Sequence, residues 1–219
     1  MDPERVVRLL AMLREADERR AVFGAGAHEY RLDSPLSEAE LVGFEERHGV
    51  PLPEDYRSFL LHCGNGGAGP YYGLFPLGLF DGAGRGLEPW KEGDGHAGVL
   101  RHPFPHSTAW NLPDESFVPS ETFSSVDEED AWHERFDAEY WAPELVAGSF
   151  PICHQGCAYR NFLIVTGASR GQVWVDGRAS DGGLVPELNR DGTPRSFSSW
   201  YFGWLEDAFR ELGLDMPSA

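Results

Sequence analysis

Hydrophobic residues near the N-terminus recur at the spacing of an amphipathic helix. Val6, Leu9, Leu10 and Leu13 fall on one stripe, which predicts a helix from about Pro3 to Arg19. Glycines favour the end of a helix and the loop that follows it. Two of them are expected to end this helix and open a linker, Gly24 and Gly26.

Two more amphipathic helices are predicted before residue 64. Ser37 and Glu40 form a capping box, in which the hydroxyl and the carboxylate each satisfy a free backbone N–H. The second helix therefore begins at Ser37, and Gly49 can supply the left-handed residue that ends it. The third helix should run from about Pro53 to Cys63, because its apolar residues share one face.

Short runs of β-branched and aromatic residues predict strands in the C-terminal half. These runs are residues 150–152, 161–166 and 172–176. The loop Gly167–Gly171 is short enough for a hairpin, so the last two strands should pair antiparallel. An earlier strand is predicted over Tyr71–Leu77.

The order of these elements predicts the fold class. Helices come first, strands second, and one helix comes last, starting near Ser196 after a polar loop from Asp176 to Arg195. This segregation is typical of an α+β fold. We expect a mostly antiparallel, twisted sheet flanked by helices.

The pattern changes between Asp81 and about Gly148. This stretch is rich in glycine, proline, acidic residues and scattered aromatics, and only Val126–Tyr140 has helical periodicity. A segment this long without regular structure is uncommon inside a compact domain and is usually functional. We interpret it as an elaboration that packs on the sheet through its aromatic residues.

Acidic residues are concentrated in the same stretch. The 219-residue chain has a formal net charge of −18, and from Asp114 to Glu144 eleven acids accompany one base, Arg135, a net −10. Charges this dense lie within the screening length of about 8 Å at physiological salt, so their potentials add. They would steer a basic protein and repel both nucleic acid and anionic membranes.

This charge predicts a surface that binds a protein partner. Clustered charge raises association rates, and aromatic side chains dominate interface hot spots. The alternative is a solvated acidic helix face whose aromatics pack in a core. The candidate residues are Asp127, Glu128, Glu129, Asp130, Trp132, Glu134, Asp137, Glu139, Tyr140 and Trp141.

Composition indicates a globular protein of the cytoplasm. The chain has no apolar run of about 18 residues, and charged residues interrupt the apolar positions of the N-terminus, so neither a membrane span nor a signal peptide is expected. The three cysteines, Cys63, Cys153 and Cys157, are too few for a disulfide framework and should be reduced.

Metal and catalytic motifs are weak. Cys153, His154 and Cys157 lie close in sequence, but a structural zinc site needs four ligands and no second pair is near, so we interpret the cysteines as apolar thiols flanking a turn. His102 and His106 are assigned to a surface loop. Nucleophile elbow, phosphate-loop and dinucleotide motifs are absent from the sequence. We therefore predict no enzyme activity, no metal and no cofactor.

Three ordered stretches resemble the SMI1/KNR4 (SUKH) family. The first contains a Leu-Pro-x-x-Tyr-x-x-Phe-Leu helix and an Asn-Gly-Gly turn, the second ends in a Val-Trp-x-Asp strand, and the third is a Phe-x-x-Trp-x-x-x-Trp-Leu helix. Ala158 departs from the pattern, since a second glycine is common there. The matching residues are Leu52, Pro53, Tyr56, Phe59, Asn65, Gly66, Gly67, Trp174, Trp200 and Trp204.

The resemblance also implies a division of the chain and a function. Residues 27–212 would form the domain, with 81–148 as a long acidic insert, 1–26 as an N-terminal helix and linker, and 213–219 as a tail. Bacterial members of the family are often immunity proteins against polymorphic toxins, and others are regulatory or scaffolding proteins.

Resemblance and charge together give the leading hypothesis, a non-enzymatic immunity protein that neutralises a basic toxin by occlusion. The alternatives are a regulatory or scaffolding SMI1/KNR4-like protein and a metal-dependent enzyme. A homo-oligomer is compatible with each of them.

Overall fold

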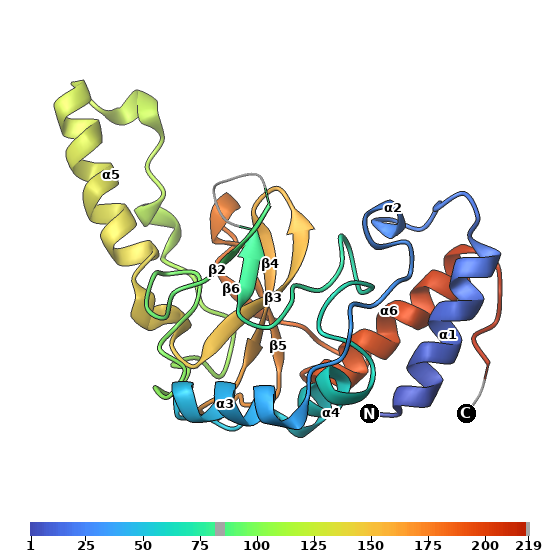
Figure 1. Cartoon of the computed structure of the whole chain (residues 1–219). Helices are drawn as coiled ribbons and strands as arrows, with labels where there is room; N and C mark the ends of the chain where they lie inside the picture. The colour runs from blue at the N-terminus through green and yellow to red at the C-terminus, as the bar shows by residue number, and fades with distance from the viewer. Residues whose placement is uncertain (82–85, 218–219) are drawn as a thin grey trace.

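The computed structural model describes residues 1–81 and 86–217. Within these residues the chain has an α+β fold, with a four-stranded antiparallel sheet, a two-stranded sheet and helices around them (Figure 1). The predicted segment 81–148 and tail 213–219 each include residues outside the described ranges, 82–85 and 218–219. The α-helices are α1 (Pro3–Ala16), α2 (Ala25–His28), α3 (Glu38–His48), α4 (Glu54–His62), α5 (Val126–Tyr140) and α6 (Phe197–Glu211).

The main sheet has the strand order β3-β4-β5-β6, and every neighbouring pair is antiparallel. A two-residue turn joins the first two strands, with φ of +50° at Cys157 and +66° at Ala158. Positive φ at both central residues is typical of a type I′ hairpin, so Ala158 adopts a conformation that glycine takes more easily. The strands are β3 (Ser149–Gly156), β4 (Tyr159–Ile164), β5 (Val173–Asp176) and β6 (Leu184–Pro186), and the two-stranded sheet pairs β1 (Leu79–Asp81) with β2 (Leu87–Pro89).

Strand β4 is buried on both faces, and this divides the core into two clusters. Leu163 belongs to the larger cluster, together with residues of α1, α4 and α6, whereas its neighbours Phe162 and Ile164 belong to the smaller one. Successive side chains of a strand point to opposite faces, so one strand feeds both clusters. Phe104 and Val146 cover the second face, so part of the long middle segment packs on the sheet as predicted.

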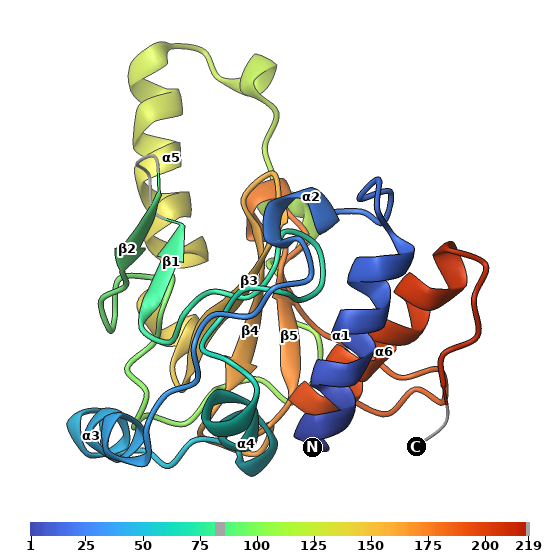
Figure 2. The same cartoon turned by 45° about the vertical axis from the view of Figure 1, so that its right-hand side comes forward.

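Helix α1 packs beside α6, as two views show (Figures 1 and 2). Its residues Val6, Leu9, Leu10 and Leu13 are buried in the larger cluster. The predicted N-terminal helix therefore exists and contributes to the core. The division into 1–26, 27–212 and 213–219 stays a prediction.

The N-terminal linker prediction was wrong in its local structure. Helix α1 ends at Ala16, where the Asp17 carboxylate accepts hydrogen bonds from Ala21 N (2.7 Å) and the Tyr30 hydroxyl (2.7 Å) and thereby fixes a turn. Gly24 does not end α1, because it is the left-handed residue that starts α2.

The strand predicted over Tyr71–Leu77 was also wrong. Tyr71 and Gly73 have φ of +53° and +101°, which breaks the extended backbone, and only isolated bridges form through Leu74. Strand β1 begins later, at Leu79, and the polar loop predicted from 176 to 195 contains β6. The strands β3 to β5 and the antiparallel pairing of β4 with β5 were predicted, with boundaries shifted by a few residues.

Candidate functional site

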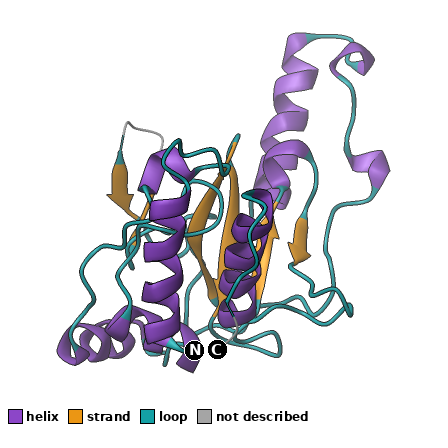
Figure 3. Ribbon diagram, turned by 90° about the vertical axis from the view of Figure 1, so that its right-hand side faces the viewer, coloured by secondary structure: helices purple, strands orange, loops and turns teal. Residues whose placement is uncertain are grey.

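The acidic segment forms an arm that extends from the body of the protein (Figures 1 and 3). We define the acidic arm as residues 114–144. It consists of two short 3-10 turns, Asp114–Ser116 and Ser120–Thr122, followed by α5 and a connection back to the sheet. Helix α5 has the bounds that its periodicity predicts, Val126–Tyr140.

Local signals explain why α5 begins where it does. The Ser125 hydroxyl accepts a hydrogen bond from Glu128 N (3.2 Å), and the Glu128 carboxylate accepts one from Ser124 N (2.9 Å). Asp127, Glu128 and Glu129 lie in the first turn, where negative charge is favoured by the helix dipole. Capping of this kind contributes about 1 kcal/mol.

A line of aromatic rings in contact runs along one face of the arm. Trp132, Phe136 and Tyr140 are four residues apart on α5, and their ring centroids are separated by 4.8 and 5.0 Å. Phe123 lies 5.5 Å from Trp132, and Phe117 lies 5.5 Å from Phe136. We call these five residues the aromatic seam. Because of it, α5 packs on its own preceding segment and not on the sheet, so the predicted aromatic packing on the sheet was only partly right.

The seam ends at Tyr140, which is fully buried at the base of the arm. Its hydroxyl donates to Asn111 Oδ1 (2.8 Å) and accepts from Gly183 N (3.1 Å), while Trp110 stacks on its ring at 5.8 Å. Burial raises the pKa of the Tyr140 phenol above its ordinary value. This residue therefore connects the arm to the end of the sheet.

Arg178 fixes the same junction, and sequence reasoning missed it. The side chain is 1% exposed and forms a two-pronged ion pair with Asp176, with two N–O distances of 2.8 Å. It also donates to the carbonyls of Tyr140 (3.2 Å) and Gly95 (2.9 Å), and it lies 4.5 Å from the Trp141 ring. A buried guanidinium needs this many partners to offset its lost hydration. The one feature of the sequence that could have indicated this role is that Arg178 follows Asp176, the last residue of β5, by two positions.

The carboxylates of α5 are largely unneutralised. In the part of the chain that the structure describes, one of them contacts a basic side chain: Glu129, at 3.9 Å from His133. The other acids of the helix face solvent, so their charges add over the outer surface of the arm.

The predicted partner-binding residues differ in accessibility. The exposed ones are Asp127, Glu128, Asp130, Glu134, Asp137 and Glu139, whereas Glu129, Trp132 and Trp141 are half-buried and Tyr140 is buried. The arm thus brings the acidic candidates to one surface. The three aromatic candidates contact other residues of the chain, Trp132 in the seam and the other two at its base, and only Tyr140 is buried.

The ten motif residues lie in or beside the larger core, except for Trp174, which lies in the smaller cluster. Leu52, Tyr56, Phe59 and Trp200 are at most 3% exposed. The Asn-Gly-Gly turn is structural: Asn65 Oδ1 accepts from Leu77 N (2.8 Å), and a side chain at Gly67 would meet the Arg31 carbonyl at 2.5 Å. Pro53 precedes α4, Gly66 is left-handed, and Trp204 is half-buried.

The cysteines and histidine near the β3–β4 turn point in different directions. Cys153 is buried and donates to the Pro70 carbonyl (3.1 Å), and burial raises the pKa of its thiol. His154 pairs with Asp81 at 3.3 Å, and Cys157 is exposed in the turn. Across residues 1–81 and 86–217, no three His, Cys, Asp or Glu side chains gather as metal ligands. Within the same ranges, none of the helices has the length and apolar character needed to cross a bilayer.

The fold and the arm together define an α+β domain with an extended charged surface and a core that contains most of the sequence-motif residues. The family model described as SMI1 / KNR4 family (SUKH-1) matches residues 35–186, and the chain belongs to this family. Membership indicates an immunity-type domain that binds a partner protein. Neither a curated protein nor a solved structure matches the chain.

Proposed function

We propose that this protein binds and blocks a basic protein of the toxin class through its acidic arm, without chemistry of its own. The observation that carries the proposal is the outer surface of α5, where six exposed carboxylates lie with little internal neutralisation. Family membership supports a protein partner, and the sign of the charge supports a basic one. In this proposal residues 81–148 are an elaboration of the family domain that sets partner choice.

The mechanism is electrostatic steering followed by occlusion. A clustered charge of this kind raises an association rate by about 10- to 10³-fold at low salt. The aromatic seam and the Arg178 junction hold the helix in place, so little ordering entropy is lost on binding. Because the seam rings of α5 pack against the preceding segment while the carboxylates face solvent, the acids make the first contact with the partner.

The test uses two variants with the same change in net charge. One neutralises the arm, D130N/E134Q/D137N, and the control neutralises exposed acids elsewhere, E15Q/E18Q/E46Q. Both variants and the wild type are used to capture protein from a lysate of the source cell, at low and high salt. We expect the arm variant to lose most capture, the control to retain it, and high salt to weaken the wild type. Equal capture by the two variants, or no binding at either salt concentration, would refute the proposal.

A regulatory or scaffolding role is the second candidate. The contacts that Trp132, Tyr140 and Trp141 make within the chain favour this role. With these rings occupied, the exposed face of α5 is purely acidic, and such a face can serve solubility alone. In that case the arm variant would lose solubility and not partner binding. The same capture experiment separates the two roles.

A further inference from the structure

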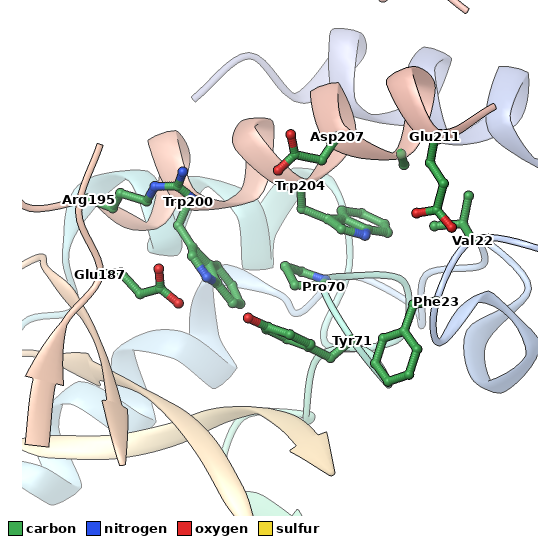
Figure 4. A pocket seen from close by; sticks show the side chains of 11 residues that line it. Val22, Phe23, Pro70, Tyr71, Glu187, Arg195, Trp200, Trp204, Asp207 and Glu211 are labelled. Carbon is green, nitrogen blue, oxygen red and sulfur yellow. The ribbon is translucent and has the colours of Figure 1, made fainter. Parts of the chain in front are cut away.

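A second candidate site lies away from the arm, beside α6. A pocket of about 210 Å³ opens between α6, the segment before α2 and the chain around Pro70 (Figure 4). Small-molecule and cofactor pockets usually measure about 300–1,000 Å³, so this one is the right size for a single side chain.

Aromatic rings form the walls of the pocket. Figure 4 shows Trp200, Trp204, Tyr71 and Phe23 around its interior, with Trp200 and Trp204 contributed by α6. Phe23 is 57% exposed and lies 5.4 Å from the ring of Tyr72, which is 45% exposed. Phe23 lines the pocket and Tyr72 lies beside Phe23, and exposed aromatic rings grouped in this way are typical of binding surfaces, because water contact with them is unfavourable.

The walls are held rigidly. Tyr71 has a left-handed backbone, and a side chain at Gly24 would lie 1.6 Å from the Tyr71 carbonyl oxygen, so only glycine permits this close approach. Tyr72 N donates to the His154 carbonyl (3.2 Å), which ties the segment to β3. A non-glycine residue in this conformation costs about 1–3 kcal/mol and is often found at functional sites.

The charge at the pocket is predominantly negative. Three carboxylates line it, Glu187, Asp207 and Glu211, against one guanidinium, Arg195. Figure 4 places Arg195 and Glu187 at one end, and Glu211 and Phe23 at the other. Asp207 is ion-paired with Arg210, whereas Glu211 makes no ion pair within the described ranges. The end formed by Glu211, Phe23 and Trp204 therefore combines an unpaired carboxylate with aromatic faces.

We propose that this pocket binds an arginine side chain of a partner protein. A guanidinium is planar, stacks on aromatic faces and bonds a carboxylate, and it is more weakly hydrated than an ammonium group. The aliphatic part of the side chain would lie along Trp204, and the guanidinium would reach Glu211. This site is separate from the acidic arm and does not depend on it.

The probe is the blocked peptide acetyl-Gly-Arg-Gly-amide, titrated into the full-length protein. The readout is the indole N–H signal of Trp204 in a ¹⁵N–¹H correlation spectrum, assigned from the W204F variant. We expect a saturable shift with a millimolar Kd, and a smaller response to the lysine peptide. The peptide with citrulline in place of arginine has nearly the same shape but no charge, and it should not shift the indole N–H signal of Trp204.

Two matched variants test which carboxylate of α6 binds the guanidinium. Glu206 and Glu211 are both exposed on α6, but only Glu211 lines the pocket. E211Q should raise the Kd for the arginine peptide about twofold to fivefold, as for an exposed ion pair, while E206Q should leave it unchanged. The arm variant D130N/E134Q/D137N should bind the peptide as the wild type does, even where it loses the protein partner.

The proposal fails if the citrulline peptide binds as tightly as the arginine peptide, or if Trp204 does not respond to the arginine peptide at about 20 mM. It also fails if E206Q and E211Q weaken binding equally, because the effect would then come from the general charge of α6. Loss of peptide binding in the arm variant would assign the site to the arm instead.

Discussion

His28 shows how burial of one residue makes the stability of the protein depend on pH. Its Nδ1 atom accepts a hydrogen bond from Tyr30 N (3.0 Å), and its ring packs at 5.7 Å from Trp204. Burial lowers the pKa of His28 from 6.5 to about 4, so the folded protein holds the neutral ring. The unfolded chain binds a proton on this residue more readily than the folded protein does.

The direction of the pH effect follows from that difference. The contribution of His28 is fully present above pH 6.5 and is lost as the pH falls toward 4, because the unfolded chain takes up the proton first. Between pH 8 and pH 5 we expect this residue alone to lower the free energy of unfolding by about 2 kcal/mol. Urea unfolding across this range should show a shallower pH dependence in H28Q than in the wild type. The exposed residue His102 supplies the control, since H102Q should leave the slope unchanged. Equal slopes in H28Q and the wild type would contradict the assignment.

At the scale of the element, the arm is a helix whose packing partner is its own preceding segment. The aromatic seam joins α5 to residues near Phe117 and Phe123 and reaches the sheet only at Tyr140. Elements with few contacts to the main core open more easily than the rest of a protein. We therefore expect the arm to unfold locally before the sheet does.

Phe136 lies in the middle of the seam, so its truncation tests this expectation. F136A removes a half-buried ring that contacts Trp132, Phe117 and Tyr140, at a cost of about 1–2 kcal/mol to the packing of the arm. Amide hydrogen exchange in α5 should become about 5- to 30-fold faster, while exchange in β4 stays the same. V126A is the matched control on the same helix, because Val126 is 70% exposed. Uniform acceleration in α5 and β4 would show that the arm and the sheet unfold as one unit.

At the scale of the whole molecule, the packing of α1 bears on whether residues 1–26 are separate from the domain. Its four buried apolar residues pack in the same cluster as α4 and α6. Each buried side chain of this kind contributes about 1.5–3 kcal/mol, so together they rival the 5–15 kcal/mol that stabilise a typical domain.

Removal of residues 1–26 should therefore abolish cooperative unfolding. Near-ultraviolet circular dichroism and a thermal melt would measure it, with two point variants to show that packing is the cause. L9A should be destabilised by about 2–5 kcal/mol because Leu9 is fully buried, whereas V7A should lie within about 0.5 kcal/mol of the wild type because Val7 is 50% exposed. A truncated chain with a native spectrum and a sharp transition would support a separate N-terminal helix and linker.

Local signals account for what could be predicted from the sequence. The capping box at Ser37, the periodicity of Val126–Tyr140 and the heavy apolar face of α6 all act within a few residues, and the structure has helices at each place. Strand β6 was missed because it is three residues long and is defined by its pairing with β5. Tyr71–Leu77 was misassigned because its apolar composition does not reveal the positive φ angles that break it.

In the candidate site, too, features set by local sequence could be predicted and features set by distant contacts could not. The concentration of acids on the arm is a property of the sequence, so it could be predicted, although its role in binding stays a prediction. The inward position of Tyr140 depends on Asn111 and Gly183, which are distant in sequence, and no local pattern encodes that contact. The pocket beside α6 likewise draws on segments around residues 22, 70, 187 and 204.

Arg178 joins three parts of the chain that are far apart along the backbone: the loop at Gly95, the end of α5, and the last residue of β5. Loss of either member of the Arg178–Asp176 pair leaves the other charged, buried and without compensation, at a cost of about 3–5 kcal/mol. Arg178 and Asp176 are therefore expected to be replaced together and not one at a time. Homologues that have an arm of this kind should therefore carry the arginine, the aspartate and the aromatic ring of Trp141 together.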